Sequence, residues 1–142
     1  MSGAELPAPA PPVVPETKPF WDGTKAGRLM LPRCPHCSFV IWYPRQFCPE
    51  CGQFPIEWFE ATGLGVIYSY SVVRRGEGAY RDTPQYTLAV VELQEGPRVL
   101  TNIIDCDPAE LRIGQSVRAV FCDTGESAAL LRFRPLAPAN SR

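Results

Sequence analysis

The sequence has no excess of either charge and no long hydrophobic run. Its 14 Lys and Arg residues balance 15 Asp and Glu residues, which gives a net charge of −1. Proteins that bind the nucleic-acid backbone neutralise several phosphates with basic side chains, so the balance argues against such a function. The most apolar run, residues 39–43, is far shorter than the roughly 20 residues of a membrane-spanning helix. We therefore expect neither a nucleic-acid nor a membrane partner.

The N-terminus lacks the features of a secretory signal. Residues 1–16, MSGAELPAPAPPVVPE, have no cationic start and no long apolar stretch. We therefore expect a cytoplasmic location, where reducing conditions favour metal binding by clustered cysteines over disulfide formation.

Histidine is nearly absent, because His36 is the single one in the chain. A nucleophilic Ser or Cys usually needs a neighbouring base, and His36 lies inside a Cys-Pro-x-Cys motif. Cys106 and Cys122 stand alone near the ends of predicted strands and are expected to be packing residues. We therefore do not expect the chain to be catalytic alone.

β-branched and aromatic residues recur in five segments of the C-terminal half, which predicts five strands. These segments are Leu64–Arg74, Tyr86–Leu93, Arg98–Ile104, Gln115–Cys122 and Ala129–Arg134. Between the third and fourth, Asp107 and Pro108 predict one short helical turn. Three strands, a helical turn and two strands is the order of the OB-fold, a five-stranded barrel, although a meander sandwich would read similarly.

The N-terminal half divides into segments of different composition. Residues 1–16 are rich in Pro and Ala without hydrophobic periodicity, which predicts disorder, and Pro19–Met30 predicts a short helix weakened by Gly23 and Gly27. The expected fold is mainly β. Its parts are a disordered tail (1–16), a helical segment (17–32), a zinc ribbon (33–60), an OB-fold (61–136) and a C-terminal tail (137–142).

Four cysteines form a repeated motif, Cys34-Pro-His-Cys37 and Cys48-Pro-Glu-Cys51. Two such turns place four sulfurs around one point, as a tetrahedral zinc ion requires, and four thiolates leave no open position for a catalytic water. Two disulfides or unmodified thiols are the alternatives. The spacing favours structural zinc on Cys34, Cys37, Cys48 and Cys51.

Aromatic residues are dense around the cysteines. The run 39–43, together with Phe54, Trp58 and Phe59, exceeds what a small ribbon can cover. We expect part of this surface to pack on the barrel or on a partner protein.

The chain resembles the acyl-CoA-associated zinc-ribbon/OB-fold family known as domain of unknown function thirty-five, over residues 19–135. The resemblance rests on the two cysteine pairs and on Phe20-Trp21, Gly27-Arg-Leu29, Gly65-Val-Ile-Tyr-Ser69, Val91-Glu-Leu93, Gly96-Pro-Arg-Val-Leu-Thr-Asn102 and Gly114. It implies an N-terminal helical segment, a rubredoxin-like zinc ribbon and a C-terminal OB-fold barrel.

The same resemblance implies a role as a small, non-catalytic partner subunit of a thiolase-like enzyme. Such enzymes include thiolases of aromatic acyl-CoA degradation and lipid-transfer-type aldolases that shorten steroid side chains. In these complexes the large subunit carries the catalytic residues and the small one braces the CoA site. A CoA thioester would then bind at the site that the two subunits share.

The loop after the first barrel strand is the candidate ligand contact, because OB-folds bind through this loop. It carries Arg74, Arg75, Tyr80 and Arg81. Guanidinium groups pair with phosphates and an aromatic ring can stack on adenine, so the loop is expected to contact a CoA nucleotide or an acidic rim of the partner. A solvated loop without a ligand is the alternative.

Two other functions remain open. Barrels with aromatic and Arg side chains can bind single-stranded nucleic acid, although the net charge of −1 argues against it. An independent thioesterase or hydratase has the least support, because the chain offers no nucleophile with a base.

Overall fold

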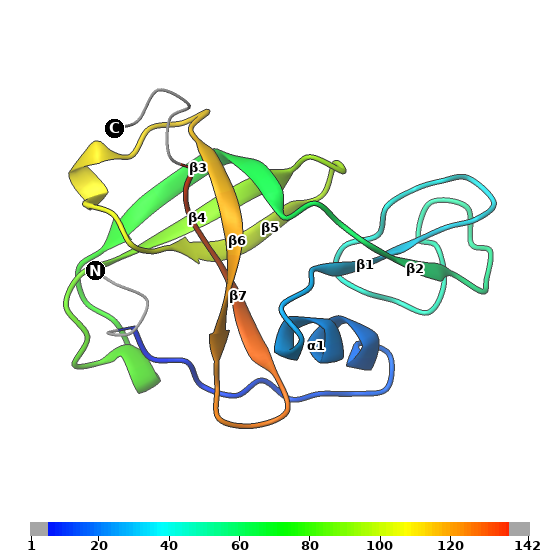
Figure 1. The fold of residues 1–142 in the computed structure, drawn as a ribbon, viewed down its shortest axis with the longest axis horizontal. Coiled ribbons are helices and arrows are strands. Elements are labelled where there is room, and N and C mark those ends of the chain that lie inside the picture. The colour runs from blue at the N-terminus through cyan, green and yellow to red at the C-terminus, as the bar shows by residue number, and fades with distance from the viewer. Residues whose placement is uncertain (1–5, 137–142) are drawn as a thin grey trace.

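The computed structural model describes residues 6–136, so the predicted C-terminal tail and residues 1–5 of the predicted N-terminal tail lie outside the described residues. Figure 1 shows a small ribbon at one end of the molecule and a barrel at the other, with the helix α1 beside the first ribbon strand. The elements follow the order helix, two ribbon strands and five barrel strands, with one short 3-10 helix after the first and one after the third barrel strand.

Helix α1 spans Lys18–Lys25 and begins with a proline in its first turn, where the missing N–H costs nothing. It ends earlier than the predicted Met30, because Gly27 has a positive φ of 78°. The Gly27 N–H donates to the Thr24 carbonyl, and the Arg28 N–H donates to the Gly23 carbonyl. These two bonds form a Schellman motif, which ends the helix and turns the chain into the ribbon.

The ribbon is built on two short antiparallel strands, β1 (Met30–Arg33) and β2 (Glu57–Glu60). Leu31 pairs with Phe59 in the middle of this sheet, and the cysteine-bearing loops connect the two strands. Four residues are too few to show the alternating pattern by which strands are recognised, so the sequence did not predict either strand.

The barrel consists of β3 (Leu64–Val73), β4 (Tyr86–Leu93), β5 (Arg98–Ile103), β6 (Ser116–Asp123) and β7 (Ala129–Pro135). It is closed in the order β3-β4-β5-β7-β6, and β5 runs parallel to β7. The 3-10 turns η1 (Gly78–Tyr80) and η2 (Pro108–Glu110) follow β3 and β5. Closure into one barrel confirms the OB-fold and removes the sandwich alternative.

One apolar core joins the helix, the ribbon and the barrel. Phe20 of α1 and Leu31 of β1 belong to the same buried cluster as Ile67 and Phe133 of the barrel. Part of the ribbon's aromatic surface packs on the barrel, as the sequence predicted, because Trp42 and Trp58 pack against this cluster. Others stay in solvent, and Phe54 is 74% exposed.

Helix α1 is anchored to the β6–β7 hairpin by two side chains. The buried Thr24 hydroxyl donates to the Trp21 carbonyl at 2.6 Å and accepts from the Ala129 N–H at 3.1 Å. The Lys25 ammonium lies 2.6 Å from the Asp123 carboxylate at the surface. This carboxylate accepts from Lys25 and from the Gly125 N–H, which lowers the pKa of Asp123.

The start of the described N-terminal segment contacts the barrel at residues 6 and 7. Leu6 is 4% exposed, and its carbonyl accepts from Arg132 of β7. Arg132 also donates to the Pro7 carbonyl. A long-range contact of this kind leaves no periodic pattern in the sequence, so composition could not predict it.

Candidate functional site

The four cysteines lie on two turns of similar backbone geometry. In each turn the first cysteine accepts at its carbonyl from the N–H four residues later, Ser38 to Cys34 and Gly52 to Cys48, both at 2.8 Å. Ser38 and Gly52 both have a positive φ, 68° and 77°. Glycine adopts this conformation freely, whereas Ser38 is a non-glycine residue at the equivalent position of the first turn.

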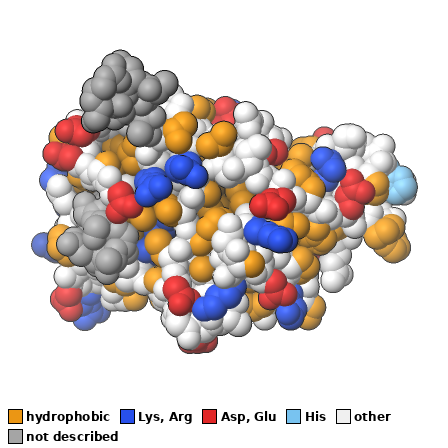
Figure 2. Space-filling view, viewed as in Figure 1, with side chains coloured by type: hydrophobic (Ala, Val, Ile, Leu, Met, Phe, Trp, Pro, Cys, Tyr) orange, Lys and Arg blue, Asp and Glu red, His pale blue; other side chains and the backbone are white. Residues whose placement is uncertain are grey.

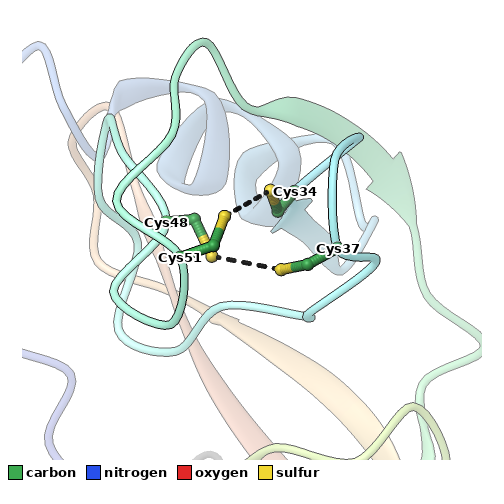
Figure 3. Close-up of side chains that lie close together, drawn as sticks. All are labelled: Cys34, Cys37, Cys48 and Cys51. Carbon is green, nitrogen blue, oxygen red and sulfur yellow. Dashed lines mark hydrogen bonds between the residues drawn. The ribbon is translucent and has the colours of Figure 1, made fainter.

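The four sulfurs converge on one point between the turns, as Figure 3 shows. All four lie within 4.8 Å of one another, and the Cys34–Cys51 and Cys37–Cys48 sulfur pairs are each 3.6 Å apart. A disulfide would require about 2.05 Å, so the cysteines are not cross-linked. Zn–S bonds of about 2.3 Å place tetrahedral sulfurs about 3.8 Å apart, so this set fits a zinc ion.

The protonation of these thiols responds to burial and to nearby N–H groups. Burial raises the pKa of Cys34, but the N–H groups of Cys37 and His36 outweigh it and bring the pKa to about 7. The Phe39 N–H lowers the pKa of Cys37, whereas burial and the adjacent thiols raise it to about 12. A metal cation favours the deprotonated form of all four, because thiolates are the zinc ligands.

His36 takes no part in a catalytic arrangement. Its side chain is exposed, and its backbone N–H faces the Cys34 sulfur at 3.4 Å. Because His36 is the single histidine of the chain, no Ser or Cys elsewhere has a histidine base. Four cysteine ligands would fill a tetrahedral zinc shell without His36, so a metal centre here would be closed and structural in character.

The predicted arginine loop is only partly available to a ligand. Arg74 donates to the Gln85 side chain at 3.1 Å, and Arg75 and Arg81 are exposed. Tyr80 is engaged elsewhere, because its ring packs 5.3 Å from that of Tyr86 and its hydroxyl accepts from Arg132 at 3.2 Å. Tyr80 therefore contacts Arg132 and Tyr86, whereas the three arginines of the loop remain the candidate ligand contacts.

Arg132 is a polar residue that the sequence did not single out. It lies on β7 between Leu131 and Phe133, yet it is only 1% exposed. Its burial depends on residues 6–7 and on Tyr80, which are remote in sequence. No local signal in the strand distinguishes Arg132 from the exposed Arg134, so sequence reasoning had no means of finding it.

The surface seen in Figure 2 carries hydrophobic, acidic and basic side chains close together, without a continuous basic stripe on this face. Several cations of the described residues are paired with carboxylates, as in Arg98–Glu92 at 3.3 Å and Arg33–Glu57 at 3.3 Å. In the described part of the chain, no helix is long and apolar enough to cross a membrane.

Two family models cover most of the chain. Residues 21–57 match the ChsH2 rubredoxin-like zinc ribbon domain, and residues 58–122 match the ChsH2 C-terminal OB-fold domain. The first range covers β1 and the cysteine-bearing loops, and the second runs from β2 through β6 and ends before β7.

Two relatives illustrate the range of proteins that contain this unit. The chain is 40% identical over 90 residues to a DUF35 domain-containing scaffold protein of Methanothermobacter thermautotrophicus, covering 63% of this chain and 68% of the relative. It is 34% identical over 128 residues to the probable enoyl-CoA hydratase alpha subunit of Thermomonospora curvata, covering 89% of this chain. It spans only 40% of that hydratase subunit.

A solved structure shares the whole architecture. The chain resembles a chain of the Ltp2-ChsH2(DUF35) aldolase with a TM-score of 0.78 and 31% identity, covering 89% of this chain and 98% of the other. The matched family models, the scaffold-protein relative and this shared architecture agree. The chain therefore belongs to the DUF35 family, in which a rubredoxin-like zinc ribbon precedes an OB-fold of the ChsH2 type.

Proposed function

We propose that the chain is a non-catalytic accessory subunit of an acyl-CoA-processing enzyme, with a thiolase-like catalytic subunit such as an aldolase as its partner. The observation that carries this proposal is the match to a chain of the Ltp2-ChsH2(DUF35) aldolase, which extends over 98% of that chain. A zinc ion on the four cysteines would hold the ribbon in shape and would take no part in the reaction.

The residue chemistry supports an accessory role. Acyl transfer requires a nucleophile, a base and donors that stabilise an oxyanion. The single histidine lies in the metal ribbon. Cys106 lies partly buried beside acidic residues, and burial raises its pKa, which disfavours a reactive thiolate.

Copurification and turnover assays test the proposal together. The tagged chain, expressed in its native host, should retain a thiolase-like protein that mass spectrometry identifies. We expect acyl-CoA turnover by the two proteins together and none by the chain alone. Turnover by the isolated chain, or full activity of the partner without it, would contradict the proposal.

The exposed arginines of the loop after β3 are the proposed contact with CoA phosphates or with an acidic rim of the partner. Arg75 and Arg81 are exposed, and Arg74 has one neutral partner, Gln85. Replacing Arg74 and Arg75 with Ala should weaken CoA affinity of the complex. Arg118→Ala, an exposed arginine of β6, is the matched control. Unchanged affinity in the double variant would remove the loop from the site.

Single-stranded nucleic-acid binding is the competing function and is tested directly. The net charge of −1 leads us to expect no micromolar binding of single-stranded oligonucleotides at physiological salt. Salt-dependent micromolar binding would favour the competing function.

We also propose a cytoplasmic location, and the free cysteines are consistent with it.

A further inference from the structure

Tyr80 attaches the loop after β3, residues 74–85 (the arginine loop), to the barrel. Most residues of this loop are exposed, whereas Tyr80 is half-buried. The Tyr80 ring packs 5.3 Å from the ring of Tyr86 on β4, and the Tyr80 hydroxyl accepts from the guanidinium of Arg132 on β7 at 3.2 Å. One side chain therefore ties a largely exposed loop to two barrel strands.

Gly76 lies directly against Tyr80 inside the arginine loop. A Cβ atom at Gly76 would lie 2.5 Å from the Tyr80 carbonyl oxygen and 2.8 Å from the Tyr80 Cβ. Arg75 precedes Gly76 and Arg81 follows Tyr80, and both arginine side chains are exposed. The position of Tyr80 therefore sets the spacing between the backbones of these two arginines.

Arg132 orients the Tyr80 hydroxyl, and the N-terminal segment orients Arg132. The Nη1 of Arg132 donates to the Leu6 carbonyl at 3.4 Å, and its Nη2 donates both to the Pro7 carbonyl and to the Tyr80 hydroxyl. Because the guanidinium is planar, the two carbonyls fix the direction in which Nη2 points. Leu6 is 4% exposed and Arg132 is 1% exposed. In Figure 1 the start of the described chain lies beside η1, at the end of the barrel away from the ribbon.

We propose that Leu6, Pro7, Arg132 and Tyr80 form one positioning network, which holds the arginine loop in the conformation that contacts the phosphates of CoA. Arg132 is a positioning residue here, because it acts on the ligand only through Tyr80. A loop that is ordered before binding loses less conformational entropy when it binds, so the network should raise CoA affinity. The effect on CoA rests on the proposed function of the loop, whereas the ordering of the loop does not.

Hydrogen exchange of the full zinc-loaded chain without CoA tests the ordering of the loop. The N–H groups of Tyr80, Arg81 and Thr83 donate to carbonyls inside the loop, so their exchange rates report its opening. Tyr80→Phe keeps the ring and removes the hydroxyl, and it should speed the exchange of these amides roughly three-fold or more, because one hydrogen bond is lost. Unchanged exchange in the loop, or an equal increase in β6, would overturn the proposal.

Tyr70→Phe is the matched control for this variant. Tyr70 is a half-buried residue of β3, and its hydroxyl donates to the Leu111 carbonyl at 2.9 Å, outside the arginine loop. This variant loses a comparable hydrogen bond, yet it should leave the exchange of the arginine loop unchanged. The same acceleration in Tyr70→Phe would reveal a general loss of stability and would overturn the proposal.

Two deletions test the N-terminal part of the network. Deleting residues 2–7 removes both carbonyl acceptors and should speed the exchange of the loop amides, as Tyr80→Phe does. Deleting residues 2–5 keeps Leu6 and Pro7 and should leave loop exchange unchanged. Because the longer deletion and Tyr80→Phe break the same series of contacts, their combined effect should be smaller than the sum of the two. Equal exchange in the two deletions, or additive effects, would overturn the network.

The CoA affinity of the complex with the partner separates this inference from the proposed function. Tyr80→Phe should raise the Kd for CoA roughly three-fold or more, but less than the double variant Arg74→Ala and Arg75→Ala does. A raised Kd in the double variant with an unchanged Kd in Tyr80→Phe would overturn the positioning role and leave the CoA contact in place. Faster loop exchange in Tyr80→Phe with an unchanged Kd in both variants would instead contradict the CoA contact, while the ordering of the loop would stand.

Discussion

Close contact between strands leaves no room for a side chain at Gly65. A Cβ atom there would lie 2.7 Å from the Glu92 carbonyl oxygen and 2.8 Å from a methyl carbon of Val91. Both neighbours belong to β4, which pairs with β3 at this point. The barrel therefore depends on a glycine here for reasons of space, because its backbone does not need a positive φ.

Gly65→Ala should lower the free energy of unfolding by about 1–3 kcal/mol, because the backbone must move to admit the methyl group. Urea denaturation followed by circular dichroism measures this change. Ser71→Ala, at an exposed position of the same strand, should alter stability by less than about 0.5 kcal/mol. Equal stability of both variants would show that β3 and β4 can move apart to admit the methyl group without a loss of stability.

At the same scale, a cysteine substitution distinguishes the metal ligands from the other thiols. Cys48→Ser removes a buried sulfur of the cluster, whereas Cys122→Ser alters a cysteine outside it. We expect about one zinc per chain in Cys122→Ser and well below one in Cys48→Ser, measured by elemental analysis after purification. A full zinc content in Cys48→Ser would rule out its role as a ligand.

At the scale of elements, the docking of α1 separates a buried contact from an exposed one. Thr24 is 1% exposed and bonds to two backbone groups, one of them in β7. The ion pair of Lys25 with Asp123 lies at the surface, where solvent weakens it. The Thr24 hydroxyl should therefore contribute more than the Lys25 charge to the free energy that holds α1 on the β6–β7 hairpin.

Thr24→Val keeps the shape of the side chain and removes both hydrogen bonds. We expect it to lower the free energy of unfolding by about 1–3 kcal/mol, because the Ala129 N–H and the Trp21 carbonyl each lose the hydrogen bond to the Thr24 hydroxyl. Lys25→Ala should cost less than about 1 kcal/mol. Thermal denaturation of both variants measures the difference, and a larger effect of Lys25→Ala would reverse this ranking.

The sequence predicted the elements that carry a local pattern. All five barrel strands were expected within two residues of their ends, because β-branched and aromatic residues mark each of them. The spacing of the four cysteines is also a local pattern, and it predicted the metal cluster. β1 and β2 were missed because each has four residues.

Features that depend on distant contacts could not be predicted. The burial of Arg132 depends on Leu6, Pro7 and Tyr80, and the docking of Leu6 depends in turn on Arg132. The aromatic side chains of α1 and of the ribbon also come together with β5 and β7 only in the folded structure. No window of the sequence contains all of these segments.

At the scale of the whole molecule, the shared core links the ribbon to the barrel. Residues of α1, β1 and the barrel strands belong to one buried cluster, so the ribbon cannot separate without exposing barrel surface. The residues on the two sides of the predicted boundary near residue 60 therefore share one hydrophobic core. Since the core is shared, unfolding should be cooperative.

We expect the zinc-loaded chain to unfold in a single transition. Tryptophan fluorescence reports on α1 and the ribbon, because all three tryptophans lie there, and far-ultraviolet circular dichroism reports mainly on the barrel strands. The two midpoints in guanidinium chloride should coincide. A fluorescence transition at clearly lower denaturant would show that the ribbon unfolds on its own.

The contact between Arg132 and Leu6 also has a consequence for biosynthesis. The two residues are 126 positions apart, and Thr24 and Ala129 are 105 positions apart. A ribosome makes residues 6–25 long before β7, so the contacts of Leu6 and Thr24 with this strand cannot form until β7 has been made. Phe20 can pack on Trp42 and Tyr43 of the ribbon earlier, so docking of α1 on the ribbon can precede its docking on the barrel.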